Sequence, residues 1–220
     1  MPVAQPGLLT DRVFDTIHAA IMSGELPAGT QLKVRDLASQ VGTSVMPVRE
    51  AIRRLEESGL AVREPHKGAI VKSLTTSELV QTYEVRILLE VEAARRGAPG
   101  VTDDDCRAMQ ALCDRLVQAF DDGSIVDALN YDEEMLAILY TASGNHVLVD
   151  SIRGLWQQCR AYKIRGAQRA RETSVRRLWS FQPRIVDAAR KRDGTLAAKV
   201  TRESLRYSMD TIGTSFATKA

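Results

Sequence analysis

The 220-residue sequence has few aromatic residues and no long apolar run. Phe, Trp and Tyr make up 5% of the residues, which argues against a β-sandwich and against an aromatic surface that stacks single-stranded bases. No apolar stretch approaches the roughly 20 residues needed to cross a bilayer, and the opening MPVAQPGLLTDRV does not resemble a secretory signal. Because 44% of the residues are hydrophobic, enough for a core, we expect a globular, cytoplasmic protein with no membrane partner.

Cysteine is scarce, and catalytic motifs are missing. Cys106, Cys113 and Cys159 cannot all pair, and none lies in a C-x-x-C motif, which is typical of reduced thiols in the cytoplasm. Cys106 and Cys113 are seven residues apart, and we interpret them as small core residues rather than redox sensors. The sequence contains no G-x-S-x-G, phosphate-binding loop, His–Cys pair or H-E-x-x-H motif. Since an enzyme needs a convergent nucleophile, base or metal set, we predict that this protein is not an enzyme.

The net charge of +2 hides blocks of opposite sign. Residues 75–150 contain five Lys/Arg against fifteen Asp/Glu, whereas residues 151–206 contain fifteen against four. Two interpretations remain open. Either acidic and basic helices pack beside each other, or arginines of the basic block face a cavity and hold an anionic ligand.

Residues 8–72 have the pattern of a winged helix-turn-helix. Apolar residues at helical spacing predict helices over 10–23 and 33–41 and a third that starts at Pro47 and ends at Gly59. AVREPHKGAIV then predicts two short strands around a Pro-His-Lys-Gly turn. In this arrangement the third helix enters the DNA major groove, and the wing lies along the backbone or the minor groove.

Arg49 is the best candidate for reading a base from the third helix. An exposed arginine on such a helix can donate two hydrogen bonds to guanine O6 and N7. Thr43 or Ser44 can cap the helix start and suits phosphate contacts. Arg53 shares a face with Arg49, and the alternative is that this face is solvated, with Arg53 paired to Glu57 one turn on.

The first seventy residues resemble the DNA-binding domain of the GntR family of bacterial transcription regulators. The similarity runs without a gap over residues 8–72, and GELPAGTQL and PVREAIRRLEESGL are its most specific parts. It implies that Arg35 and Arg49 contact DNA. It also implies that the wing contributes through His66 and Gly68, with Lys67 between them.

One position departs from this family. An arginine is common two residues before the proline, where this sequence has Val45. The corresponding DNA contact is therefore missing or replaced by an apolar one, such as a contact to a thymine methyl group. We expect the operator to differ from the usual half-site of the family.

The rest of the chain is predicted to be helical. Helices are expected from Thr76 to about residue 97 and over 103–120, 124–142, 146–165, 170–191 and 195–214. Six helices of this length predict an antiparallel bundle with a ligand site in its core. The expected fold is thus mostly α, with a winged helix-turn-helix at 8–72 and a bundle at 76–214. Trp156 and Tyr162 are expected in the core or at a subunit interface.

The helical part is similar to the FCD ligand domain of the FadR-type GntR subfamily. ELVQTYEVRILLEVEAA and LYTASGNHVLVDSI carry the similarity. Many members hold a divalent metal with one aspartate and three histidines, and alignment on the ASGN element and on Asp193 places these ligands at Asp132, Leu136, Gln182 and Ser204. Only the aspartate is present. Zinc, nickel and manganese favour imidazole or several carboxylates, so we predict no tightly bound metal and no cofactor.

Polar groups at these positions are expected to bind an effector directly. The candidates for lining the pocket are Asp132, Gln182 and Ser204. Arg86 is a candidate to donate bidentate hydrogen bonds to a carboxylate. The alternative for Arg86 is an internal ion pair with Glu90 or Glu133. Arg160 and Arg165 are weaker candidates.

These inferences predict a ligand-responsive transcription regulator. We expect a repressor that binds a palindromic double-stranded operator as a homodimer and responds to a small, anionic effector such as an organic acid or acyl compound. One alternative is a metal-dependent sensor or enzyme for small carboxylates that uses the bundle pocket. Another is a DNA-packaging protein without sequence preference.

Overall fold

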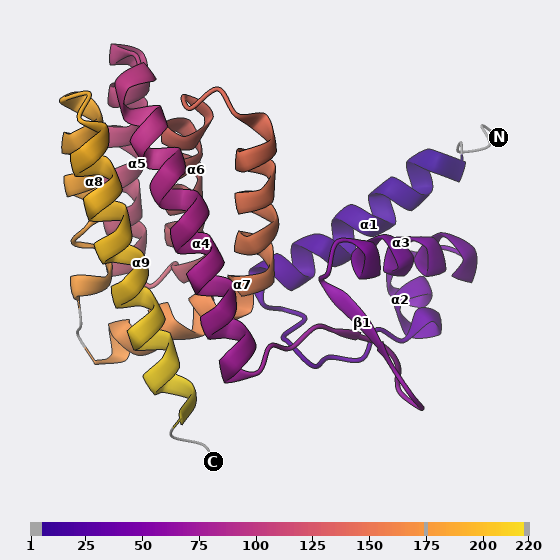
Figure 1. Ribbon diagram of the computed structural model, residues 1–220. Coiled ribbons are helices and arrows are strands. Elements are labelled where there is room, and N and C mark those ends of the chain that lie inside the picture. The colour runs from indigo at the N-terminus through magenta and orange to yellow at the C-terminus, as the bar shows by residue number, and fades with distance from the viewer. Residues whose placement is uncertain (1–5, 174–175, 218–220) are drawn as a thin grey trace. The chain divides into compact units, whose positions relative to one another are not determined.

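The computed structural model describes residues 6–173 and 176–217 and divides into two compact units between Leu74 and Thr75. Each unit has its own hydrophobic core, and each is described by itself. The expected fold class, a winged helix-turn-helix followed by an antiparallel helical bundle, is confirmed (Figure 1). No helix in the described ranges is long and apolar enough to cross a membrane.

The first unit consists of three helices and a two-stranded wing. Its elements in chain order are α1 (Pro6–Ser23), α2 (Val34–Val41), α3 (Val45–Glu57), β1 (Ala61–Glu64) and β2 (Gly68–Val71). The strands are antiparallel, with Ala61 opposite Val71 and Glu64 opposite Gly68. Val48, Ala51, Ile52 and Leu55 of α3 are buried against α1 and α2. The apolar stripe read from the sequence therefore faces the core of this unit.

The start of α3 differs from the prediction. The helix begins at Val45, so Pro47 is its third residue and not its first. This costs no hydrogen bond, because none of the first four N–H groups of a helix has an intrahelical partner. Ser44 occupies the N-cap position, but its side chain makes no capping hydrogen bond. The Oγ1 atom of Thr43 is buried without a partner, so neither residue caps α3 as expected.

The second unit is a bundle of six α-helices over the residues described. They are α4 (Thr76–Gly97), α5 (Asp103–Asp122), α6 (Ile125–Thr141), α7 (His146–Glu172), α8 (Gln182–Arg190) and α9 (Gly194–Ala217). Short 3₁₀ turns lie at Ala98–Gly100 (η1) and Arg176–Trp179 (η2). Helices α4 and α9 lie side by side and run in opposite directions (Figure 1). Threonine capping boxes at Thr75 and Thr102 start α4 and α5.

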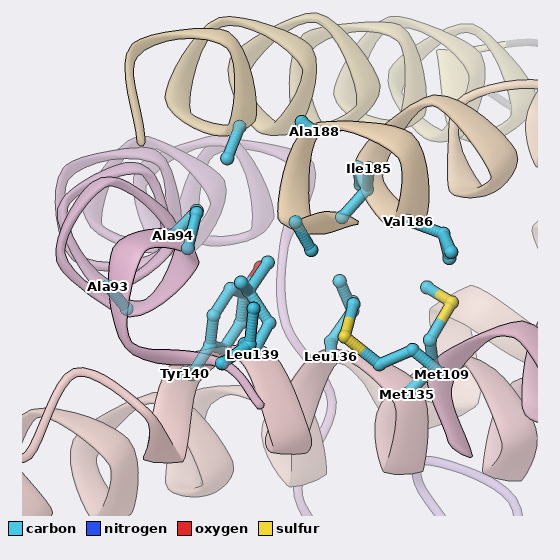
Figure 2. Close-up of a cluster of buried hydrophobic side chains, with 14 of the residues drawn as sticks. Ala93, Ala94, Met109, Met135, Leu136, Leu139, Tyr140, Ile185, Val186 and Ala188 are labelled. Atoms are coloured by element: carbon cyan, nitrogen blue, oxygen red, sulfur yellow. The ribbon is translucent and has the colours of Figure 1, made fainter. Parts of the chain in front are cut away.

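The bundle core explains why small residues recur in α4. Ala93 and Ala94 are fully buried, and Figure 2 shows them in the same layer as Leu139 and Tyr140. A methyl group added at Gly97 would lie 1.9 Å from the Leu139 carbonyl oxygen, so α4 and α6 approach too closely for a larger residue there.

The other predicted core residues are buried as well. Cys106, Cys113 and Trp156 belong to the same cluster as these alanines, and Tyr162 is also buried. Their placement confirms the packing interpretation of these four side chains.

The helix expected over 170–191 is wrong. Helix α7 continues to Glu172, and α8 begins only at Gln182 after the η2 turn. Pro183 follows at the second residue of α8, where its missing N–H costs nothing. Because the same proline would break a helix that ran through it, the two helices are separate, and this break sets Trp179 and Gln182 at the wall of a cavity.

Candidate functional site

The outward face of α3 carries three arginines in different surroundings. Arg49 is exposed and makes no ion pair with any described residue. Arg53 is paired with Glu50 and Glu57 on its own helix, which is the alternative that the sequence left open. Arg54 donates to Asp11 of α1 at 2.7 Å and lies over the Phe14 ring. Of these three arginines, Arg49 is therefore the one free to reach a partner.

Two apolar side chains stand beside Arg49 at the start of α3. Val45 is 39% exposed and Met46 is 69% exposed. Residues three and four apart are neighbours on a helix surface, so both lie near Arg49. Ser44 precedes them and is exposed. The sequence drew attention to Val45 but not to Met46.

The wing and α2 present the remaining predicted DNA contacts. Arg35, His66, Lys67 and Gly68 are all exposed. His66 and Gly68 have positive φ values of 64° and 76°, which lets the chain turn tightly between the strands. Lys67 is paired with Glu64 at 2.8 Å, and Gln31 donates its side-chain amide to the Lys67 carbonyl oxygen. All nine predicted contact residues thus belong to the first unit, and their binding to DNA stays a prediction.

The four predicted effector residues line one cavity in the second unit. Arg86, Asp132, Gln182 and Ser204 come from α4, α6, α8 and α9, and side chains of α7 and η2 complete the wall. The cavity has a volume of about 50 Å³. This is room for a few water molecules, at roughly 10–15 Å³ each.

One end of the cavity is formed by a buried ion pair. Arg86 donates from Nε to Glu90 Oε1 at 2.7 Å, and the Tyr140 hydroxyl donates to Glu90 Oε2 at 3.2 Å. Burial opposes the charge on Arg86, but Glu90 outweighs it and raises the pKa of the guanidinium. Of the two states considered for Arg86, the internal pair with Glu90 is the one found.

Asp132 belongs to a second cluster of buried polar and charged side chains. Gln182 donates from Nε2 to Asp132 Oδ1 at 3.1 Å, and Lys163 Nζ lies 3.8 Å from Oδ2. Burial raises the pKa of Asp132, with Lys163 and Gln182 acting in the opposite direction. Burial also disfavours the charge on Glu133, but Lys163 at 2.8 Å and Arg160 at 3.1 Å lower its pKa overall.

These pairs decide between the two interpretations of the charge blocks. Arg160 and Lys163 of the basic block bind Glu133 of the acidic block, and Arg192 binds Asp103 at 2.7 Å. Acidic and basic helices are thus packed together. Among the described residues, Lys163 is the one Lys or Arg of the basic block that lines the cavity, and neither Arg160 nor Arg165 does.

Several polar atoms at the cavity wall are buried without a hydrogen-bond partner. They are Nη1 of Arg86, Oε1 of Gln182, Oγ1 of Thr201 and Nε1 of Trp179. An unpaired buried polar atom costs about 1–3 kcal/mol. Arg86 Nη1 and Trp179 Nε1 donate, Gln182 Oε1 accepts, and the Thr201 hydroxyl can do either. These four atoms suit a bound molecule that has oxygen acceptors and one hydrogen-bond donor.

The donor set does not fit the metal that the FCD resemblance implies. Leu136, at the position of the first histidine, is a buried apolar residue of the cavity wall. Gln182 and Ser204 offer an amide and a hydroxyl beside the single carboxylate of Asp132. Over the described residues, no group of three or more His, Cys, Asp or Glu side chains could hold a metal ion. No imidazole lines this cavity among the described residues, and its second carboxylate, Glu90, already accepts from Arg86 and Tyr140.

Sequence reasoning missed several residues of the cavity wall. Thr201, Ser208 and Thr211 follow the spacing of Ser204 along one face of α9 and line the cavity with it, so this polar stripe was visible in the sequence. Lys163 was visible only as one of fifteen cations in its block. Trp179 lies in η2, where the sequence had placed a continuous helix.

Comparison with protein families finds two matches in this chain. Residues 9–71 match the model of the bacterial regulatory proteins of the gntR family, and residues 81–207 match the FCD domain. The chain is 28% identical over 148 residues to the HTH-type transcriptional regulator McbR of Escherichia coli K12, and the aligned residues make up 67% of each sequence. It is 38% identical over 90 residues to the probable D-xylose utilization operon transcriptional repressor of Paenarthrobacter nicotinovorans, covering 41% of this chain and 40% of that protein.

Solved structures agree in fold. The structure of McbR/YncC from E. coli superposes with a TM-score of 0.82 at 22% identity, covering 98% of this chain and all of that one. A GntR-type putative transcriptional regulator from Rhodococcus sp. RHA1 gives a TM-score of 0.81 at 19% identity, covering 94% and 98%. At these identities the likeness concerns the fold alone.

Proposed function

Because the chain belongs to the GntR family of bacterial regulatory proteins and carries an FCD domain, it is a transcription regulator, and we propose that it is a repressor controlled by a small metabolite. We propose that residues 8–72 bind DNA and residues 76–214 bind the metabolite and dimerise. The name of the Paenarthrobacter relative describes that protein as a repressor, which supports the same direction of control here. The site of action is the cytoplasm, where bacterial DNA lies.

The DNA-binding proposal rests mainly on Arg49. Its guanidinium is exposed on α3 and unpaired among the described residues, whereas both neighbouring arginines are held within the unit. In the major groove, Arg49 donates to guanine, and Arg35, Ser44 and the wing bind the backbone. The Thr43 hydroxyl is buried and the Thr43 N–H donates to the Ala38 carbonyl oxygen, so Thr43 is not part of this contact. Two copies related by two-fold symmetry bind the two halves of a palindromic operator.

Replacing Arg49 by alanine tests this proposal. A bidentate pair between arginine and guanine is worth about 1–3 kcal/mol of discrimination, so we expect operator affinity to fall about 5- to 150-fold for each such pair removed. Binding to random duplex should change much less. Arg107→Ala is a matched control, because Arg107 is an exposed helical arginine in the other unit. Unchanged operator affinity in the Arg49 variant would refute the assignment.

The metabolite proposal rests on the unpaired atoms of the cavity wall. An organic acid or acyl compound can accept hydrogen bonds from Arg86 Nη1 and Thr201 Oγ1, while Leu129, Leu136 and Ile185 cover its carbon chain. Control requires that the effector binds one conformation of the protein better than another. The segment Lys72–Thr76 joins the units and is the route for this coupling.

A thermal-shift screen with organic acids and acyl compounds tests the cavity. A true effector should raise the melting temperature and weaken operator binding, and Thr201→Val should reduce both effects because it removes one hydroxyl from the wall. Ser151→Val is a control on an exposed hydroxyl of α7. The alternative of a metal-dependent carboxylate sensor is supported only if the purified protein contains near-stoichiometric metal.

A further inference from the structure

The most outward position on the first turn of α3 is occupied by methionine. The buried stripe of this helix contains Val48, Ile52 and Leu55. With 3.6 residues per turn, Met46 lies on the opposite side, and its side chain is 69% exposed. Val45 beside it is 39% exposed. Single exposed apolar residues are common, but these two adjoin the free Arg49 on the face assigned to DNA.

We infer that Met46, with Val45 at its side, contacts the 5-methyl group of a thymine next to the guanine bound by Arg49 in each half-site. This inference rests on the proposed DNA-binding function. Neither side chain can donate a hydrogen bond to a phosphate or a base. The apolar group that bases present in the major groove is the thymine methyl, so it is the partner that this end of α3 fits.

The distance between Met46 and Arg49 sets the position of the thymine. Three residues correspond to about 4.5 Å along a helix, and successive bases of one strand are about 3.4 Å apart along the duplex. The two side chains therefore reach adjacent base pairs.

Charge around the two apolar side chains favours DNA over a protein partner. Arg49 and Arg35 are exposed in the same unit without an ion pair to any described residue, and the N-terminal turn of α3 presents free N–H groups, which attract anions. An apolar protein surface would leave these groups without counter-charges. A duplex supplies phosphates for the charged groups and a methyl group for Met46 in one site.

The test compares thymine with uracil, which differ only by this methyl group. The full-length protein first selects its operator from a random duplex library at fixed salt. The thymine next to the guanine is then replaced by deoxyuridine in each half-site. Affinity of the wild-type protein should fall about fourfold per half-site, as expected when one buried methyl group is removed. Deoxyuridine at a thymine outside the half-sites is the matched DNA control and should have no effect.

The Met46→Ala protein completes the cycle. It should bind the thymine operator more weakly than wild type does and bind thymine and uracil operators equally. Because Met46 is exposed, the Met46→Ala protein should melt at the same temperature as wild type. The comparison of thymine and uracil operators with the wild-type protein does not depend on this variant. An equal thymine-to-uracil loss in both proteins, no loss in either, or a selected half-site without a thymine beside the guanine would overturn the inference. Failure to select any sequence would instead overturn the proposed regulator function.

Discussion

Two glutamates of α4 that are two residues apart have opposite surroundings. Glu90 is fully buried, accepts from Arg86 and Tyr140, and borders the cavity. Glu92 is partly exposed and accepts from Arg95 and Arg96 on the surface of the same helix. Removing one partner of a buried pair leaves the other charge without compensation, whereas exposed pairs are screened by water.

Alanine substitution at these two positions should therefore give different results. We expect Glu90→Ala to lower the free energy of unfolding of the second unit by about 3–5 kcal/mol, because Arg86 then remains buried and unpaired. Glu92→Ala should have no measurable effect. Denaturant unfolding followed by circular dichroism measures both. Equal losses in the two variants would show that the Arg86–Glu90 pair is not buried in solution.

The buried carboxyl group of Asp132 should make the folding stability of the second unit depend on pH. Burial raises the pKa of Asp132 above its ordinary value of 3.8. A carboxyl group with a higher pKa in the folded chain binds more protons when folded, so its contribution to stability increases as pH falls through the raised pKa. Above that pKa, the buried charge lowers stability. We expect Asp132→Asn to melt at a higher temperature than wild type at pH 7.5, with the difference shrinking as pH is lowered.

The neighbouring Glu133 provides a control of opposite sign. Burial disfavours its charge, but Lys163 and Arg160 lower its pKa overall. Its contribution to stability is therefore present above the ordinary pKa of 4.5 and is lost as pH falls through the lowered value. Glu133→Gln should melt at a lower temperature than wild type at pH 7.5. A stabilising effect of Glu133→Gln, or a pH-independent effect of Asp132→Asn, would contradict these surroundings.

Helices and strands were predictable where their signals were local. Apolar residues at helical spacing placed most elements to within a few residues, and the glycines after Val41 and Asp122 lie at the C-caps of α2 and α5. The start of α3 could not be predicted to the residue, because Pro47 is tolerated anywhere in the first turn. Helix α8 was also misplaced, since helical spacing continues through 170–191, although Pro183 is a local signal for a break there.

The cavity was predictable only in part, because it joins residues of different helices. The resemblance to the FCD domain placed Asp132, Gln182 and Ser204, and the structure brings them into one cavity with Arg86. The pairing of Arg86 with Glu90 could be foreseen as one of two states, because the residues are four apart. Which state forms depends on burial by α6 and α7, and no spacing within α4 contains that information.

The relative register of α6, α8 and α9 can be tested by building a metal site. If Leu136, Gln182 and Ser204 occupy the positions of the three family histidines, then replacing all three by histidine beside Asp132 should create one site for zinc or nickel. We expect about one metal ion per chain and a rise in melting temperature on metal addition, with neither effect in wild type. Adding Asp132→Asn to the triple variant should weaken binding. A triple variant that folds but binds no metal would show a different register.

For the whole molecule, the separation into two cores means that each of the two proposed activities has its site within one unit. The α3 face belongs to the first core and the cavity to the second. The proposed operator binding also involves two copies of the chain. If the protein binds as a two-fold dimer, its two α3 helices must meet two half-sites at a fixed distance and rotation, about one helical turn apart.

Operator spacing tests this arrangement in the complete protein. Five base pairs inserted between the half-sites turn one of them by about half a helical turn, so a dimer can no longer place both α3 helices in the major groove. We expect the affinity to fall to that measured for an operator with one half-site scrambled, and sedimentation should find two chains on the intact operator. Because independent monomers would bind each half-site regardless of spacing, an insertion without effect would mean that no symmetric dimer reads the operator.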